Sequence, residues 1–206
     1  MTDIKPGTRA LGIAESTAKG TGECTICGAV VRRDRVTDGF AFATATVGGI
    51  DATSAIQTVI NDLCRPDVQY ILISGVAPAW FNLIDISSLA HTAERPVIAV
   101  SYEQSAGLES ALREHFAGDA LEQRLTQYQE LPDREQLMIA ADDSADGDNG
   151  DDNTLFFRSA RVDTTTTETI IRAYTPVGGR PEPVRVARLA ARGARQWDQR
   201  VGTTNG

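Results

Sequence analysis

Lysine is nearly absent from this chain of 206 residues. Of its 20 basic residues only Lys5 and Lys19 are lysines, against 28 acidic residues, and the formal net charge is −8. A lysine-poor surface rich in aspartate and threonine is typical of proteins that stay soluble in high salt, so we expect a halophilic protein. An acidic surface that binds a basic partner is the alternative. Six aspartates lie between Asp142 and Asp152, so the rest of the surface can still approach a nucleic acid.

Long apolar runs are also missing. No run approaches the roughly 18 residues of a membrane-spanning helix, and the first residues, MTDIKPGTRA, lack the apolar core of a signal peptide. We therefore expect a cytoplasmic protein that does not bind membranes. Cys24, Cys27 and Cys64 are an odd number of cysteines, which predicts free thiols and no disulfide partner in a reducing compartment. Cys24 and Cys27 have the spacing of half a zinc site, but no second Cys/His pair accompanies them, which favours structural thiols.

Common catalytic motifs are absent as well. The chain contains no phosphate-binding P-loop and no G-x-S-x-G elbow. Its two histidines, His91 and His115, fall on expected helices without a serine or cysteine nucleophile motif beside them. A hydrolase triad is therefore unsupported, and a small-molecule nucleotide binder ranks below the functions considered next.

The hydrophobic pattern predicts one α/β domain over residues 1–206. Strands are expected at residues 10–15, 25–32, 39–47, 70–74, 96–101, 137–141 and 155–160. Helices are expected at residues 51–63, 84–91, 108–116, 121–128, 165–174 and 184–194. The first three strands are joined too closely for crossovers and should form an antiparallel meander, and the later alternation implies a mixed sheet with helices on its faces. The acidic segment at about 141–153 is expected to be a disordered insertion, and the tail from about 197 to be frayed.

The most informative stretch runs from Tyr70 to Ile86. It opens with an apolar run short enough to be a strand buried on both faces, and Ser74 ends that run. Trp80 and Phe81 follow in the loop beyond the carboxyl end of the strand, where open α/β sheets bind their ligands. Many metal-dependent enzymes place a carboxylate at such a strand tip, whereas this chain has a serine.

Three carboxylates are candidates for a site at this edge. Glu15 ends the first strand, Asp51 opens the first helix, and Asp85 follows the loop after the fourth strand. Brought together, they can hold Mg²⁺ for phosphodiester cleavage. The structural alternatives are helix N-caps for the two aspartates and a solvated strand end for Glu15.

Two further features are suited to nucleic acid. One face of the last helix carries four arginines, Arg185, Arg188, Arg192 and Arg195. Arginines in this arrangement can hold backbone phosphates or simply form a solvated helix face. Trp80 and Phe81 can stack on a base or pack beneath their own loop.

Six segments in order carry a family resemblance: KPGTRALGIAES, VVRRDRVTDGF, TVGGIDAT, ISGVAPAWFNLIDI, RPVIAVS and GGRPEPVRVARLAARG. From about Lys5 to Ala194, with the acidic insertion set aside, the chain resembles the archaeal endonuclease dU family. That family is similar to endonuclease V, which implies a ribonuclease H-like fold. The resemblance implies a DNA-repair nuclease that cleaves DNA at deaminated bases, deoxyuridine in particular, with Mg²⁺ or Mn²⁺.

The resemblance also implies three acidic metal ligands, at positions 14, 51 and 74. Only Asp51 is retained, because Ala14 and Ser74 occupy the other two positions. Glu15 and Asp85 are the candidate substitutes. The alternative function is a catalytically degenerate nucleic-acid-binding protein on the same fold.

Overall fold

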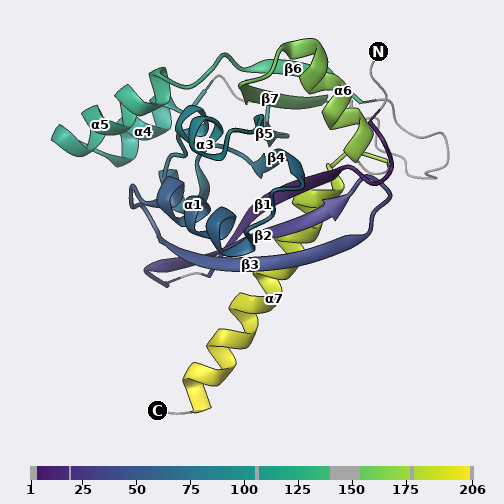
Figure 1. Ribbon diagram of the computed structural model, residues 1–206. Helices are drawn as coiled ribbons and strands as arrows, with labels where there is room; N and C mark the ends of the chain where they lie inside the picture. Colours follow the sequence, from purple (N-terminus) through teal and green to yellow (C-terminus); the bar gives the residue numbers. More distant parts are fainter. Residues whose placement is uncertain (1–3, 19, 105–106, 140–153, 177–178, 205–206) are drawn as a thin grey trace, which may run out of the picture.

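The computed structural model describes residues 4–18, 20–104, 107–139, 154–176 and 179–204 (Figure 1). The strands in these ranges are β1 (Arg9–Thr17), β2 (Glu23–Arg32), β3 (Thr37–Thr46), β4 (Val68–Ser74), β5 (Val97–Ser101), β6 (Glu135–Met138) and β7 (Thr154–Ala160). The helices are α1 (Ala52–Leu63), α2 (Pro78–Phe81), α3 (Ile86–Ala93), α4 (Glu109–His115), α5 (Gly118–Gln129), α6 (Thr164–Tyr174) and α7 (Glu182–Thr204). The expected acidic insertion lies outside the described residues.

The strands form one sheet in the order β3-β2-β1-β4-β5-β7-β6. β1, β4 and β5 are parallel, and the other neighbouring pairs are antiparallel. The predicted meander of β1 to β3 and the predicted mixed sheet are therefore confirmed. The carboxyl ends of the three parallel strands lie at one edge of the sheet, where ligands bind in open α/β folds.

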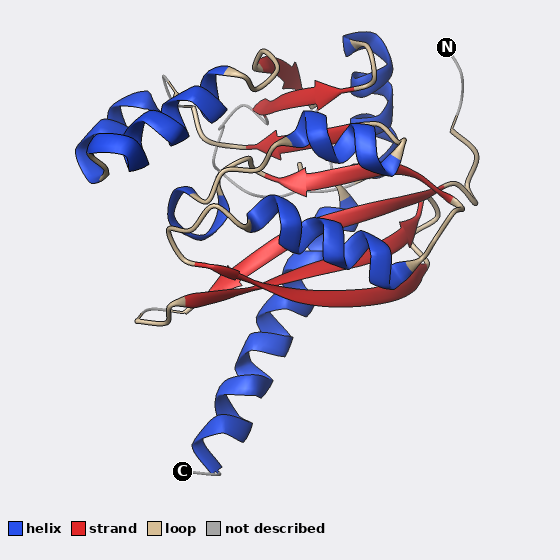
Figure 2. Cartoon of the chain, turned by 60° about the vertical axis from the view of Figure 1, so that its left-hand side comes forward, coloured by secondary structure: helices blue, strands red, loops and turns tan. Residues whose placement is uncertain are grey.

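Helices cover both faces of this sheet (Figure 2). α1 and α3 pack over one face, in a core cluster that includes Ile71 and Ile73 of β4. α6 and the first turns of α7 pack over the other face. There, Leu72 belongs to a second core cluster, together with buried side chains of these two helices. β4 is therefore apolar at consecutive positions, as a strand buried on both faces requires. None of the described helices is both long and apolar enough to cross a membrane.

The start of α7 lies directly on β1 because Gly12 has no side chain. A Cβ atom at Gly12 would lie 2.0 Å from the backbone carbonyl carbon and oxygen of Pro183. The following turns bury Val184, Ala187 and Ala191 against the sheet. Gly12 therefore sets how closely the last helix approaches β1.

The tail expected to fray from about 197 is helical to Thr204. The chain offers the helix no proline in this region, and Arg195 Nη1 donates to Gln199 Oε1 one turn later at 3.2 Å. The last turns of α7 project beyond the sheet (Figure 1), and Trp197 is 69% exposed there. Helix propensity and side-chain contacts along the helix extend it past the part that packs on the sheet.

The register of β1 and β4 places Ala14 and Ser74 side by side. These are the two positions at which the family resemblance implies acidic ligands that this chain lacks. Ile13 pairs with Ile73 in the parallel ladder, so the next residues, Ala14 and Ser74, are neighbours at the carboxyl edge. Ala14 is buried beneath α7 in a small cluster with Ala187. Two neighbouring positions at the sheet edge therefore lack the carboxylates that the family resemblance implies.

Candidate functional site

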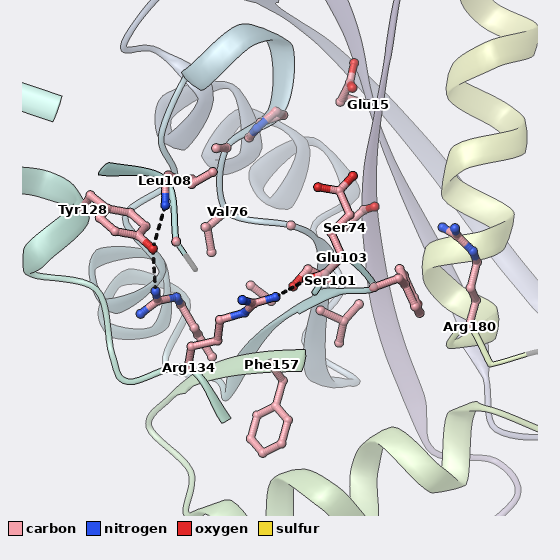
Figure 3. A pocket seen from close by; sticks show the side chains of 18 of the residues that line it. Glu15, Ser74, Val76, Ser101, Glu103, Leu108, Tyr128, Arg134, Phe157 and Arg180 are labelled. Carbon is pink, nitrogen blue, oxygen red and sulfur yellow. Dashed lines mark hydrogen bonds between the residues drawn. The ribbon is translucent and has the colours of Figure 1, made fainter. Parts of the chain in front are cut away.

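A cavity of about 410 Å³ opens at the carboxyl edge of β4 and β5 (Figure 3). We call it the edge cavity. The polar and charged residues of its lining are Glu15, Ser74, Ser101, Tyr102, Glu103, Tyr128, Arg134, Arg158, Arg180 and Arg188. They come from β1, β4, β5, β7, α5, α7 and the segments between them, so the cavity collects side chains from most of the chain.

Hydrogen bonds fix the wall of the edge cavity that is formed by α5 and β7. The Tyr128 hydroxyl accepts from the backbone N–H of Leu108 at 3.2 Å and from Arg158 Nη2 at 3.2 Å, as Figure 3 shows. Arg158 Nη1 also donates to the carbonyl of Pro132. Arg134 Nη2 donates to the carbonyl of Glu103. These two guanidinium groups therefore hold the loops of the wall in place.

Asp51 occupies the position before α1, but its side chain does not cap the helix. Its carboxylate accepts instead from Thr46 N at 3.0 Å, from Thr46 Oγ1 at 2.8 Å and from Asn82 Nδ2 at 2.6 Å. Burial alone would raise the pKa of Asp51, but the hydrogen bonds from Asn82 and Thr46 lower it below its usual value. Asp51 is therefore an ionised group at neutral pH.

Asn82 supplies the missing cap. Its Oδ1 accepts from the backbone N–H of Ala52 at 2.9 Å, and its Nδ2 also donates to the Thr46 carbonyl at 2.8 Å. The side chain is fully buried. Asp51 therefore stands at the N-cap position without a side-chain cap bond, and Asn82 accepts from the first N–H of the helix.

Asp85 does act as a cap. Its Oδ1 accepts from the backbone N–H of Ser88 at 2.8 Å at the start of α3. Its own backbone N–H donates to Thr53 Oγ1 at 3.0 Å, which ties it to α1. Glu15 lines the edge cavity and accepts from Thr17 Oγ1 at 2.6 Å. Within the described ranges, no group of three or more His, Cys, Asp or Glu residues could hold a metal ion.

The charges of Glu15 and Asp51 both reach the Cys24 thiol. Burial raises the pKa of Cys24 to about 11, and the two carboxylates add to that effect. Burial also raises the pKa of Cys27 to about 12. Both buried cysteines are therefore unreactive thiols at neutral pH, and the exposed Cys64 is a free thiol as well.

The loop after β4 turns sharply at α2. Ala79, Trp80 and Phe81 all have positive φ, at 47°, 62° and 59°. Phe81 is half-buried, with its ring 5.6 Å from His115 and 6.0 Å from Phe116. Trp80 lies 4.8 Å from His115 and remains 55% exposed. Phe81 therefore packs within its own surroundings, whereas Trp80 presents its ring to solvent.

The four arginines on one face of α7 have different partners in the structure. Arg185 is paired with Glu182 through Nη2 and Oε1 at 2.6 Å, and Arg195 Nε donates to Ser16 Oγ at 2.9 Å. Arg188 lines the edge cavity, and Arg192 is exposed. Of the two arginines proposed from the sequence for phosphate binding, Arg188 is the one that reaches the cavity.

Three residues of the site were missed by reasoning from the sequence. Asn82 is part of the WFNLIDI segment, and a polar residue inside an apolar run is a signal for a buried hydrogen-bond role. Arg180 precedes the last helix, so helical spacing could not include it. Tyr102 follows β5 directly, at the same sheet edge as Ser74.

Comparison with known proteins agrees with this architecture. A UPF0215 protein of Pyrobaculum aerophilum is 28% identical over 93% of this chain and 97% of that protein. A UPF0215 protein of Methanosarcina acetivorans is 30% identical, with 92% of each chain covered. An Archaeoglobus fulgidus protein of unknown function matches in structure with a TM-score of 0.73 and 23% identity, over 90% of this chain and 97% of that one.

Endonuclease V has the same fold. The Ciona intestinalis enzyme, solved with a 24mer DNA containing an inosine followed by a ribo-adenosine, matches with a TM-score of 0.59 and 13% identity over 92% of this chain and 86% of that chain. The Streptomyces avermitilis endonuclease V matches with a TM-score of 0.60 and 19% identity, over 96% and 86%. The family model described as Endonuclease dU matches residues 6–195. The chain therefore belongs to the endonuclease dU family and has the ribonuclease H-like fold of endonuclease V.

Proposed function

We propose that this protein is a DNA-repair endonuclease that acts at deaminated bases, with deoxyuridine as the expected lesion. The observation that carries the proposal is the state of Asp51. In a member of the endonuclease dU family, this carboxylate is ionised, released from helix capping and fixed by a buried asparagine at the sheet edge. A group held in this way is suited to a functional role and not only to local stability.

The residues around Asp51 are compatible with Mg²⁺. The ion prefers oxygen donors and commonly takes one or two carboxylates from the protein, with water and substrate phosphate completing its shell. Asp51 and Glu15 are the first candidates, because Asn82 holds Asp51 at the start of α1 and Glu15 lines the edge cavity. Asp85 is the third, although one of its oxygens already accepts from Ser88. A bound ion would supply positive charge for the attacking and leaving oxygens of a phosphodiester.

Protein groups beside this edge can position DNA. Arg188 offers a guanidinium group at the mouth of the edge cavity, where it can hold a backbone phosphate. Arg185 would have to exchange its pairing with Glu182 for a phosphate contact. Trp80 is exposed for stacking next to the lesion, and Phe81 supports it from below.

The second candidate function is binding of damaged DNA without cleavage. It is favoured by one specific observation, which is that Ala14 and Ser74 stand side by side at the carboxyl edge. These are the two positions at which the family resemblance places acidic ligands. A protein that lacked both would keep the groove and lose the reaction.

A cleavage assay separates the two functions. Purified protein in molar KCl with Mg²⁺ or Mn²⁺ is given oligonucleotides that contain deoxyuridine, inosine or no lesion. We expect cleavage near deoxyuridine that disappears in Asp51→Asn and persists in Asp62→Asn, an exposed aspartate on the same helix. Lesion-dependent binding without cleavage supports the second candidate. If lesion and control duplexes bind equally and neither is cut, both functions are refuted.

A further inference from the structure

Two guanidinium groups and one phenol hydroxyl meet in the edge cavity. Arg180 (Figure 3), Arg188 and Tyr102, the residue that follows β5, all line it. We propose that this corner of the edge cavity binds a phosphate monoester, and that it does so without a metal ion. The site lies in the cavity that Glu15 also lines and shares Arg188 with the phosphate contact proposed above, but binding in EDTA tests it without any metal ion, so its failure and the failure of the nuclease activity can be told apart.

The guanidinium group of Arg180 can contact a ligand in the cavity. Its guanidinium carbon lies 4.2 Å from the centre of the Tyr102 ring, a stacked arrangement that leaves the N–H groups at the rim free to point elsewhere. Within the described ranges neither Arg180 nor Arg188 has a hydrogen-bond acceptor or an acidic partner. Both guanidinium groups can therefore donate to a ligand, and two positive charges in one cavity favour an anion.

The Tyr102 hydroxyl is buried and has no hydrogen-bond partner among the described residues. Buried hydroxyl groups are nearly always hydrogen-bonded, so one that is not marks a place for a ligand or a water molecule. Burial raises the pKa of Tyr102 to about 12, although Arg180 and Arg188 act in the opposite direction. The hydroxyl therefore stays protonated and can donate its proton to an anionic oxygen.

The other charges around the cavity favour the same ligand. Arg134 and Arg158 add two positive charges while holding the backbone of the wall. Glu15 and Glu103 are the acidic residues of the lining. Four arginines against two glutamates leave the cavity positive in a protein whose net charge is −8. An anion is therefore drawn to this cavity and repelled by most of the remaining surface.

Ser74 and Ala14 at the sheet edge also favour an anion in this cavity. A carboxylate at position 74 would line the edge cavity and repel a phosphate, whereas Ser74 contributes a neutral hydroxyl there. Ala14 removes a second carboxylate from the adjacent strand position. The same two residues that deprive a metal ion of ligands thus remove negative charge from an anion site. Arginine carries the positive charge that a metal ion would otherwise bring.

A phosphate monoester matches this arrangement better than a phosphodiester. A monoester is close to a dianion at neutral pH, so it gains from two guanidinium groups and a hydroxyl donor at once. It can come from a free mononucleotide or from the phosphorylated end of a nicked strand. These two sources share their chemistry and are separated by the test.

The test is a binding titration of the full-length protein in EDTA, where no metal-dependent cleavage can occur. The probes are inorganic phosphate, deoxyuridine monophosphate, and a short oligonucleotide with or without a 5′-phosphate. The variants are Arg180→Gln and Tyr102→Phe, with Arg192→Gln as the matched control, because Arg192 is exposed on α7 outside the cavity lining. Circular dichroism establishes that each variant is folded.

We expect saturable binding of phosphate in EDTA, weakened about tenfold or more by Arg180→Gln and unchanged by Arg192→Gln. Tyr102→Phe, which keeps the ring and removes only the hydroxyl, should weaken binding by a smaller factor. Tighter binding of the mononucleotide assigns the site to free nucleotide, and tighter binding of the phosphorylated oligonucleotide assigns it to a strand end. The proposal is overturned if phosphate does not saturate in EDTA, or if Arg180→Gln and Arg192→Gln behave alike. Loss of nuclease activity alone leaves these readouts unaffected.

Discussion

The side chain of Asn82 joins Asp51 to the start of α1. Its Nδ2 donates to Asp51 Oδ1 at 2.6 Å while its Oδ1 accepts from Ala52 N at 2.9 Å. One buried amide thus caps the helix and fixes the carboxylate that precedes it. A ligand at the Asp51 carboxylate, as proposed above, would leave the bond from Ala52 N to Asn82 Oδ1 in place.

Replacing Asn82 should therefore affect stability and function together. Asn82→Ala removes three hydrogen bonds from a fully buried site, and we expect it to lower the free energy of unfolding by about 2–4 kcal/mol. Urea unfolding measures the loss. The control is Asn61→Ala on the exposed face of α1, which should change stability by less than about 1 kcal/mol. Equal effects of the two substitutions would contradict the role of Asn82.

Gly12 offers a paired test of the contact between β1 and α7. Gly12→Ala places a methyl group within 2.0 Å of the Pro183 backbone, and should cost about 3 kcal/mol or more because backbone cannot move aside locally. The same substitution at Gly193, which has no neighbouring atom within 4 Å, should stabilise the helix by about 0.5–1 kcal/mol. Thermal unfolding should show a lower midpoint temperature for Gly12→Ala and a higher one for Gly193→Ala than for the wild type. A stable Gly12→Ala protein would show that α7 is not held so closely to β1.

Asp85 can be tested for two roles separately. Asp85→Asn keeps a good N-cap for α3 but removes the charge, whereas Asp85→Ala removes both and should cost about 1 kcal/mol of stability. If Asp85 helps to hold Mg²⁺, cleavage should fall in both variants, although only the alanine variant is destabilised. Cleavage at the wild-type rate in Asp85→Asn would restrict Asp85 to capping.

Trp80 and Phe81 should respond differently to truncation. Trp80→Ala should leave the free energy of unfolding within about 0.5 kcal/mol of the wild type, because the ring is 55% exposed. It should weaken binding of lesion DNA by about 1–3 kcal/mol if the ring stacks on a base. Phe81→Ala should destabilise the fold by more than about 1 kcal/mol, since it removes contacts with His115 and Phe116. Fluorescence anisotropy and urea unfolding measure the two effects, and unchanged DNA affinity in Trp80→Ala would exclude stacking.

Acid stability should depend on Asp67. Hydrogen bonds from Arg65, at 2.8 Å through both Nε and Nη2, lower the pKa of Asp67 to about 2. A carboxyl group with a lowered pKa in the folded state stabilises that state above its unfolded pKa of about 3.9 and loses this contribution as the pH falls towards 2. At low ionic strength the stability difference between wild type and Asp67→Asn should therefore be constant near pH 6 and shrink between about pH 4 and pH 2. A difference that did not change with pH would show that the charge of Asp67 contributes nothing.

Most of the fold could be predicted from the sequence, because its signals are local. The short connections after β1 and β2 allow only an antiparallel meander, and the apolar run before Ser74 requires a strand covered on both faces. The family resemblance then supplied the architecture. Helix ends were harder, since α5 starts at Gly118, which was not included in the expected helix, and α7 continues well beyond 194.

The site was only partly predictable, because its parts are joined in space and not in sequence. Asp51 and Asp85 stand directly before α1 and α3, as expected, whereas Glu15 was expected to end the first strand and lies inside β1, which continues to Thr17. The cap from Asn82 to Ala52 spans 30 positions of the chain, and no local pattern indicates it. Arg180, Tyr102 and Arg188 likewise come together only in the folded chain, because Tyr102 is about 80 positions before the two arginines.

The length of α7 has a mechanical consequence. One unbroken helix carries Arg188 at the cavity and Trp197 on the projecting end, which lie about 13 Å apart along its axis. Ala187 and Ala191 are buried on either side of Arg188, and Arg195 Nε donates to Ser16 Oγ, so the sheet anchors the helix up to about Arg195. A force on the projecting turns is therefore taken up by these contacts before it reaches the arginine in the cavity.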